Sequence, residues 1–471
     1  MASATSTASQ TEEQVSLKLV LNEKGNKVLF AEAGKDFVDI LCSFLTMPLG
    51  TIARLVEKES SIGPVSIGCL NSLYQSVADL DESCFYNDTI KQMLLKPSNS
   101  AEDYCNTLTL NIDDTPPTKY FACTYCDDLF ISTFKDKHCP RCGICVTGPL
   151  FLKHSCHGFI DGVATFAITD DLTVLPYCID YACFGLLQQF GIKFPTSVKE
   201  MVLNVTKQKV LDLLKCSLLS KYTLTDLFLG QKPSIGDSRF LSDIEFSGDL
   251  QIILKLVIRK SDGKILCAQG EQDFVNLLLS FLTFPLGDIT RIFGKNCSMG
   301  SINRLYESMT KLNENKYFTT EGAKNRLVGP CISPHLKLNN QILPILESGI
   351  LDYYRYSDVS GNHIVQYSNA GEDVSYAKLK KINVYNPQSL EGYVKGPAMY
   401  VATDDLVISH LSPISALSYL NRFKTPAYDL KEKVVTIGVK ESLSILKAAL
   451  TSTSALTNGL SHVLTEVKQE K

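Results

Sequence analysis

The feature that most constrains this chain is a long internal repeat. The segment LKLVLNEKGNKVLFAEAGKDFVDILCSFLTMPLG, at residues 17–50, recurs as LKLVIRKSDGKILCAQGEQDFVNLLLSFLTFPLG at residues 254–287. Shorter matches follow in the same order, including Thr-Asp-Asp-Leu at residues 169–172 and again at residues 403–406. A repeat spaced this widely is much longer than the unit of a solenoid. The pattern therefore predicts two copies of one domain in tandem.

Each copy is expected to begin with a β-hairpin that is followed by helices. Alternating apolar runs flank Gly-Asn at residues 25–26 and Asp-Gly at residues 262–263, which indicates two-residue turns. Asp36 stands where a helix N-cap belongs, and apolar residues at helical spacing follow it. Pro48 and Gly50 are expected to end that helix. Each copy closes with a strand and an amphipathic helix, so the predicted class is α+β.

The repeat divides the chain into five predicted segments. They are a disordered N-terminal tail, a first repeat unit, a linker rich in Gly, Pro and Ser, a second repeat unit and a C-terminal tail. Their predicted boundaries are residues 1–14, 15–229, 230–249, 250–461 and 462–471. Within the first unit, residues 118–158 are predicted to form an inserted zinc-ribbon-like knuckle.

The composition excludes several classes of protein. Of the 471 residues 45% are hydrophobic, and 46 basic against 50 acidic side chains give a net charge of −4. A chain with this much apolar content and so little net charge is not mostly disordered. Its N-terminal residues lack the apolar core of a signal peptide, and no apolar run approaches the roughly 20 residues that span a bilayer. We therefore expect a cytoplasmic or nuclear protein without a membrane segment.

The clearest chemical signal is a pair of Cys-x-x-Cys motifs. Cys123 and Cys126 form the first motif, and Cys139 and Cys142 form the second. Two such motifs can bring four thiolates to one tetrahedral ion, and zinc is the usual metal at a structural site of this kind. Gly143 follows the second motif and can take a positive φ that turns backbone N–H groups toward the sulfurs. The predicted cofactor is one structural Zn²⁺, bound by these four cysteines.

Other interpretations of this segment stay open. The four thiols could be redox-active, or they could be ordinary buried cysteines. Cys145, His154, Cys156 and His157 lie nearby in the sequence and could replace a ligand or complete a second site.

The second copy lacks the cysteine cluster. No cysteine follows Cys331, whereas residues 350–400 contain eight tyrosines. These tyrosines could form an aromatic core in place of the metal, or they could form a binding surface. Either way, a unit that folds without metal implies that the zinc of the first unit is structural. Four thiolates would also leave no open position on the ion for a substrate.

No catalytic motif accompanies this architecture. The chain has no phosphate-binding loop, dinucleotide fingerprint or nucleophile elbow. The repeated carboxylate pairs, at residues 170–171 and 404–405, could serve acid–base chemistry or bind a cation. Thr-Asp-Asp-Leu is more typical of a turn or a helix cap, so the structural interpretation is favoured.

Three classes of function follow. The preferred hypothesis is a non-enzymatic interaction or scaffold protein with a protein partner and one structural zinc site. The alternatives are an enzyme with an unrecognised active site between the units and a nucleic-acid-binding zinc ribbon. The half of the chain that carries the cysteine cluster has more acidic than basic side chains, which disfavours contacts with nucleic-acid phosphates.

The repeated motifs resemble those of a known family. DFVDILCSFLTMPLG in the first predicted helices, the two TDDL motifs and the closing LLKCSLLSKYTLT are similar to a plant-specific family of tandem-repeat proteins of unknown function. The resemblance covers about residues 16–461. It implies a plant origin and a two-copy architecture, and it implies no reaction.

Overall fold

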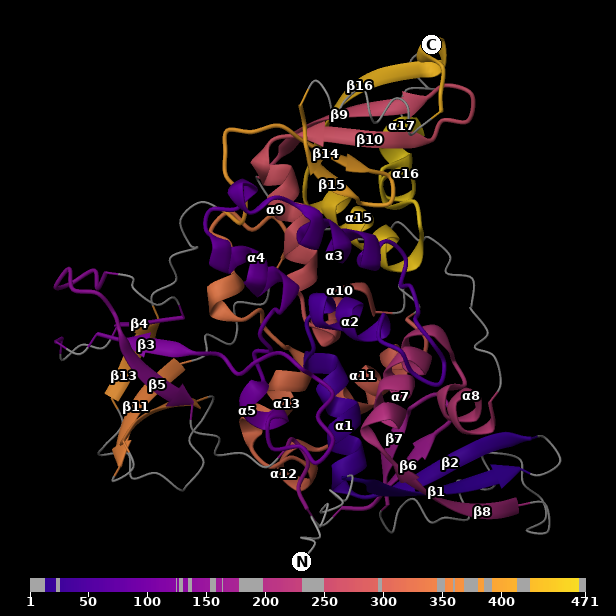
Figure 1. Cartoon of the computed structure of the whole chain (residues 1–471). Helices are drawn as coiled ribbons and strands as arrows, with labels where there is room; N and C mark the ends of the chain where they lie inside the picture. Colours follow the sequence, from indigo (N-terminus) through magenta and orange to yellow (C-terminus); the bar gives the residue numbers. More distant parts are fainter. Residues whose placement is uncertain are drawn as a thin grey trace, which may run out of the picture.

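The computed structural model describes most of the chain. The described residues are 13–22, 26–123, 125–126, 130–133, 138–152, 158–162, 164–177, 198–230, 250–294, 299–344, 352–358, 361–367, 380–384, 392–412 and 424–465. Two five-stranded sheets lie at opposite ends of the molecule, with helices between them and a small barrel at one side (Figure 1). This mixture of helices and sheets confirms the α+β class. Nearly all of the predicted linker lies outside the described residues.

The two sheets have corresponding strand orders, β7-β6-β2-β1-β8 and β15-β14-β10-β9-β16, and all neighbouring strands are antiparallel. The strands of the first sheet are β1 (Val15–Asn22), β2 (Lys27–Ala33), β6 (Phe166–Thr169), β7 (Val174–Pro176) and β8 (Val198–Val205). Those of the second are β9 (Ile252–Arg259), β10 (Ile265–Gly270), β14 (Tyr400–Thr403), β15 (Ile408–His410) and β16 (Leu430–Ile437).

The helices fall into two groups along the chain. The α-helices before residue 230 are α1 (Lys35–Thr46), α2 (Leu49–Val56), α3 (Leu70–Asp79), α4 (Asp88–Leu95), α5 (Glu102–Cys105), α7 (Lys207–Leu219) and α8 (Thr223–Leu229). The later ones are α9 (Gln272–Ser280), α10 (Leu286–Phe293), α11 (Ile302–Lys311), α12 (Glu314–Tyr317), α13 (Glu321–Val328), α15 (Val439–Thr451), α16 (Ala455–Gly459) and α17 (Ser461–Thr465). Short 3-10 helices are η1 (Glu82–Cys84), η3 (Phe281–Thr283), η5 (Pro334–Leu336) and η8 (Ala427–Asp429). Within the described ranges, no helix combines the length and the apolar character needed to cross a bilayer.

Each sheet contains the predicted hairpin, since β1 pairs with β2 and β9 pairs with β10. The turn of the second hairpin is longer than predicted. The N–H of Arg259 donates to the carbonyl of Lys264 at 2.9 Å, and the N–H of Gly263 donates to the carbonyl of Arg259 at 2.9 Å. Gly263 has a φ of 75°, in the left-handed region that glycine adopts easily. The prediction of a two-residue turn is therefore wrong here, because the chain closes the hairpin with a wider loop.

The first helix also differs in detail from the prediction. α1 begins at Lys35 with Gly34 at the N-cap, so Asp36 lies in the first turn, where it still interacts favourably with the helix dipole. Pro48 follows α1 as expected, but Gly50 lies inside α2 instead of ending a helix. A Cβ at Gly50 would come within 3.1 Å of the carbonyl oxygen of Leu282. Glycine at this position therefore permits a close approach between helical segments.

The two repeated Pro-Leu-Gly segments contact each other at the centre of the molecule. The N–H of Leu49 donates to the carbonyl of Phe284 at 2.9 Å, and the N–H of Leu286 donates to the carbonyl of Met47 at 2.9 Å. Leu49 corresponds to Leu286 in the repeat, and Met47 corresponds to Phe284, so each segment makes the same hydrogen bond to the other. The repeat in the sequence thus corresponds to a matched contact in the structure.

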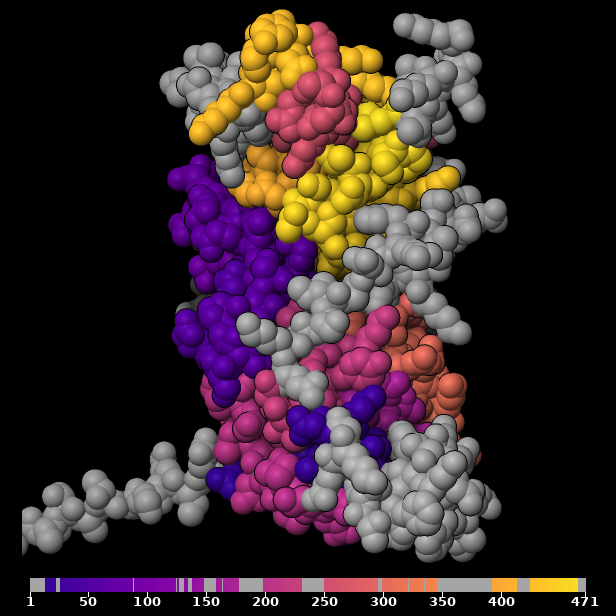
Figure 2. Space-filling view, turned by 90° about the vertical axis from the view of Figure 1, so that its right-hand side faces the viewer, coloured from indigo at the N-terminus to yellow at the C-terminus, as the bar shows by residue number. Residues whose placement is uncertain are grey.

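Each predicted unit also places a helix against the other. The N–H of Cys69, just before α3, donates to the carbonyl of Ala449 on α15 at 2.7 Å. In the matching contact, the N–H of Ser301, just before α11, donates to the carbonyl of Ser217 on α7 at 2.8 Å. The space-filling view shows the same arrangement, with early purple residues against the yellow C-terminal part (Figure 2). One apolar core consequently contains residues of both predicted units. The boundaries between the units stay a prediction from the sequence.

The small barrel combines strands from both predicted units. Its closed order is β11-β12-β5-β3-β4-β13. Its strands are β3 (Tyr120–Ala122), β4 (Phe130–Ser132), β5 (Gly148–Leu152), β11 (Asp352–Asp358), β12 (Gly361–Tyr367) and β13 (Lys380–Val384). Two parallel pairings, β5 with β12 and β4 with β13, join the cysteine-containing part to the tyrosine-rich part. The predicted ribbon is therefore one half of a shared barrel.

We expect Gly287→Ala to destabilise the protein by about 2 kcal/mol. A Cβ at this position on α10 would lie 2.9 Å from the carbonyl oxygen of Leu45 and 3.0 Å from that of Leu327. Backbone atoms cannot move aside without shifting whole helices. The free energy of unfolding in urea measures the effect, with Gly34→Ala as the control because nothing lies within 4 Å of its Cβ position. Equal losses in the two variants would contradict the tight contact.

Candidate metal centre

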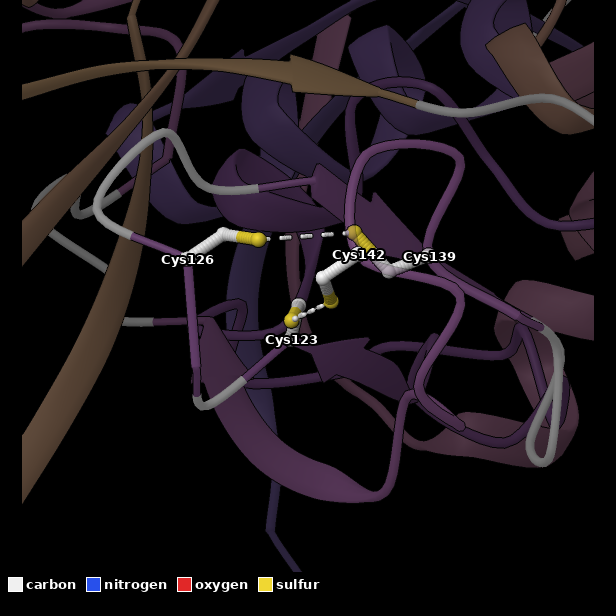
Figure 3. A group of neighbouring side chains, drawn as sticks. All are labelled: Cys123, Cys126, Cys139 and Cys142. Carbon is white, nitrogen blue, oxygen red and sulfur yellow. Dashed lines mark hydrogen bonds between the residues drawn. The ribbon is translucent and has the colours of Figure 1, made fainter.

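The four predicted metal ligands lie together beside the barrel strands (Figure 3). Cys123 follows β3 directly, Cys126 lies in the loop that leads to β4, and Cys139 and Cys142 lie between β4 and β5. All four Sγ atoms are within 4.8 Å of one another. The Sγ atoms of Cys123 and Cys142 are 3.5 Å apart, and those of Cys126 and Cys139 are 3.8 Å apart.

These distances fit a tetrahedral metal site. With Zn–S bonds of about 2.3 Å, the sulfurs of a tetrahedral site lie about 3.8 Å apart. Among the cysteine, histidine, aspartate and glutamate side chains that the structure describes, these four are the ones that lie close enough together to hold an ion. Four sulfur ligands suit zinc or iron. The four cysteines can therefore hold a metal ion.

Apolar side chains cover one side of the thiol group. Cys123 and Cys139 are each 1% exposed and pack with the buried Val146, while Phe121 is partly buried against them. Cys142 is exposed. The site thus has an apolar inner side, which limits the access of water to a bound ion, and an outer side at the protein surface.

The backbone of the second Cys-x-x-Cys motif is arranged around its first sulfur. Gly143 has a φ of 71°, and its N–H donates to the carbonyl of Cys139 at 2.8 Å. Burial raises the pKa of the Cys139 thiol, but hydrogen bonds to its sulfur from the N–H groups of Cys142 and Arg141, together with the thiols of Cys142 and Cys123, bring that pKa down to about 7. These bonds favour the thiolate, which is the form that binds metal. The positive φ predicted for Gly143 is confirmed.

Two neighbouring residues that the structure describes, His138 and Cys145, are not part of this group. Nε2 of His138 lies 3.7 Å from Sγ of Cys145, and the two residues form a backbone bridge. Neither belongs to the cluster of four thiols. His154, Cys156 and His157 lie outside the described residues, so their role as substitute ligands stays open.

The first carboxylate of each repeated Asp pair caps a helix. The carboxylate of Asp170 accepts hydrogen bonds from N–H and Oγ1 of Thr225 on α8, at 2.8 and 2.7 Å. The carboxylate of Asp404 accepts one from the N–H of Thr457 on α16 at 2.8 Å. Both residues are more than nine-tenths buried. The interpretation of Thr-Asp-Asp-Leu as a turn and a helix cap is therefore confirmed.

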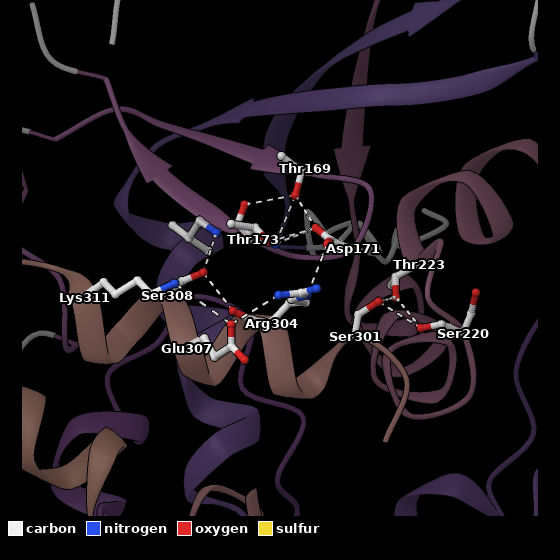
Figure 4. A network of polar contacts seen from close by, with 11 residues as sticks. Thr169, Asp171, Thr173, Ser220, Thr223, Ser301, Arg304, Glu307, Ser308 and Lys311 are labelled. Carbon is white, nitrogen blue, oxygen red and sulfur yellow. Dashed lines mark hydrogen bonds and ion pairs between the residues drawn. The ribbon is translucent and has the colours of Figure 1, made fainter. Parts of the chain in front are cut away.

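The second carboxylate of the first pair belongs to a polar network between the two predicted units (Figure 4). Asp171 accepts hydrogen bonds from the hydroxyls of Thr169 and Thr173, at 2.5 and 2.9 Å. Arg304 on α11 lies 3.7 Å from Asp171 and also donates to Glu307 at 3.2 Å. An exposed ion pair of this kind adds little stability, but it connects α11 to the turn that follows β6.

A buried histidine contact joins distant segments of the chain and was not predicted from the sequence. Nε2 of His335 lies 2.7 Å from Oγ of Ser98, and this hydroxyl donates to Oγ of Ser333 at 2.9 Å. Burial lowers the pKa of His335 to about 4, so the ring is neutral at pH 7. All three side chains are buried. A substrate therefore has no access to Ser98 and His335, although a serine beside a histidine is also the arrangement of a catalytic nucleophile and its base. No local motif marks this contact, because its residues come from segments far apart in the chain.

The tyrosine-rich segment is described only in part. Tyr353, Tyr354 and Tyr356 lie on β11 and Tyr367 lies on β12, whereas Tyr376 and Tyr385 fall outside the described residues. The other two tyrosines, Tyr393 and Tyr400, are 0% and 1% exposed. These last two belong to the apolar core, and the choice between core and binding surface stays open for the others.

Comparison with known proteins adds one match. A family model described as a protein of unknown function (DUF674) matches residues 11–440, a range that contains the cysteine cluster and both repeated segments. No curated protein and no solved structure matches the chain. The family match confirms the resemblance to a domain of unknown function. Because the matched range covers most of its length, the chain belongs to the DUF674 family.

Proposed function

We propose that this protein is a non-enzymatic interaction or scaffold protein whose barrel is held together by one structural zinc ion. The observation that carries the proposal is the convergence of four thiols within 4.8 Å of one another. Four thiolates would fill every position of a tetrahedral ion and leave none for water or substrate. The ion would then act as a cross-link between the loops that connect β3, β4 and β5.

The proposal extends to the architecture and the setting of the protein. We infer two duplicated α+β units of plant origin, and the corresponding strand orders of the two sheets support the duplication. We also infer a cytoplasmic or nuclear location and a protein partner. Within the matched Asp pairs, the first carboxylates serve as helix caps, which supports a structural role for these residues.

Elemental analysis of the purified full-length protein should find one zinc ion per chain. Cys126→Ser removes one sulfur ligand and is expected to reduce the zinc content to near zero, because three thiolates bind the ion much more weakly. Cys145→Ser, which changes a nearby cysteine outside the cluster, should retain the metal. Protein without zinc after purification under metal-replete conditions would contradict the proposal.

A second measurement separates a structural ion from a catalytic one. Co²⁺ in place of zinc should give the visible absorption of a tetrahedral site with four thiolates, and added imidazole or cyanide should leave this spectrum unchanged. A spectral change on addition of either ligand would show an open coordination position. That result would favour the alternative of an enzyme.

A further inference from the structure

A lysine–aspartate pair in the first helix of the first predicted unit is replaced by two amide residues in the second. In the first unit, Nζ of Lys35 donates to Oδ2 of Asp39 at 2.7 Å and to the carbonyl of Ile160 at 2.6 Å. In the second unit, Gln272 and Asn276 stand at the corresponding positions of the repeat. The ammonium group that fills this place in the first unit is therefore absent from the second.

Asn276 keeps the backbone contacts of its counterpart but has a spare hydrogen-bond donor. Its Oδ1 accepts from the N–H groups of Tyr393 and Val394 at 2.8 and 3.2 Å. Its Nδ2 has no hydrogen-bond acceptor among the residues that the structure describes. Asn276 is 6% exposed. Because Asn276 lines a cavity and its amide nitrogen is not fully enclosed by protein, this nitrogen can donate to a molecule that occupies the cavity.

A cavity lies at this position, bounded by α9, the start of β9 and the segment 338–342. Its volume is about 70 Å³, whereas a single water needs only about 10–15 Å³ on such a measure. Gln341 lines the same cavity, and its Oε1 is buried without a hydrogen-bond partner. A spare donor and a spare acceptor from separate elements thus meet in one space.

The lining residues define the chemistry of a ligand. Besides Asn276 and Gln341, Asp273 and Ser280 line the cavity. The hydroxyl of Ser280 donates to the carbonyl of Leu277 at 2.7 Å, so its oxygen can still accept. Hydroxyl groups satisfy such a mixed set because each can donate and accept. The carboxylate of Asp273 disfavours an anionic ligand, and none of the described residues that line the cavity is basic.

We propose that this cavity binds a small neutral polyhydroxylated molecule, such as a monosaccharide or a cyclic polyol. The spare amide of Asn276 donates to one ligand hydroxyl, and Oε1 of Gln341 accepts from another. Asp273 accepts from a hydroxyl closer to the surface. This site is separate from the cysteine cluster and goes beyond the proposed scaffold function.

Titration of the full-length protein with D-glucose, D-galactose and myo-inositol tests the proposal, by calorimetry and by saturation-transfer NMR. We expect saturable binding of at least one of the three. Gln272→Lys combined with Asn276→Asp rebuilds the lysine–aspartate pair of the first unit. This change replaces the amide donor of Asn276 by a carboxylate that is paired with lysine, and it should weaken binding by at least about tenfold. Circular dichroism should show an intact fold, because the first unit already contains the same pair.

Two single variants keep the test decisive if the double variant does not fold. Gln341→Leu and Asp273→Asn should each weaken binding several-fold, whereas Asp36→Asn, the matched change in the first unit, should leave the affinity unchanged. The proposal is overturned if wild-type protein binds none of the three probes, or if the cavity variants bind as tightly as wild type. Tighter binding of D-glucuronate than of D-glucose would also overturn it.

Discussion

Cys139→Ser is expected to release the metal and to remove hydrogen-exchange protection from the whole barrel. The strands β3 and β4 are only three residues long, so they bury too little apolar surface to stay ordered without a cross-link. The sequence alone predicts loosening over residues 118–158. The parallel pairings of β4 with β13 and of β5 with β12 extend the expected effect to β11, β12 and β13. Hydrogen exchange read by mass spectrometry measures this directly.

Both sheets should keep their slow exchange in that variant. As far as the structure describes them, the barrel strands contribute no residue to the main apolar core. Cys145→Ser is the matched control and should leave the barrel protected. Loss of protection across both sheets would make the metal necessary for the entire fold, and unchanged protection of the barrel would contradict its structural role.

Glu102→Gln is expected to stabilise the protein by about 3 kcal/mol above pH 8 and to have little effect below about pH 4.5. Burial raises the pKa of Glu102 from 4.5 to about 7, although Thr118 donates two hydrogen bonds to its carboxylate and so lowers it in part. The folded state therefore binds this proton more tightly than the unfolded chain. The contribution of protonated Glu102 to the stability of the folded state is complete below pH 4.5 and is lost as the pH rises through about 7.

Urea unfolding of variant and wild type at about pH 4.5 and about pH 8.5 measures this difference. His335 titrates in the opposite sense: its pKa is lowered to about 4, so its contribution to stability is lost as the pH falls below 6.5. Comparison with wild type at each pH removes that contribution. Glu82→Gln, at an exposed position, is the control for the substitution itself. An equal stability difference at both pH values would contradict a raised pKa at Glu102.

The sequence predicted those parts of the structure that depend on local patterns. Alternating apolar residues located both hairpins, and the spacing of the Cys-x-x-Cys motifs identified four thiols that lie together. A detail such as the N-cap of α1 was wrong because Gly34 and Asp36 are both acceptable near a helix start, and tertiary packing decides between them.

The barrel was not predictable by the same means. β4 pairs with β13 through residues such as Ile131 and Val384, which lie far apart in the chain and share no motif. The cavity at Asn276 is a similar case. The exchange of lysine and aspartate for glutamine and asparagine is visible in the repeat, but the cavity is also lined by Gln341, which belongs to a different segment.

The packing of α3 against α15, and of α11 against α7, has a consequence for synthesis on the ribosome. The N–H of Cys69 has its acceptor in the carbonyl of Ala449, which leaves the ribosome only after most of the chain has been made. The apolar side of α3 is therefore without its final partner during most of translation, although the sequence of the first sheet is already complete. Folding of this core is consequently completed only after Ala449 has left the ribosome, and the nascent first half needs protection from aggregation until then.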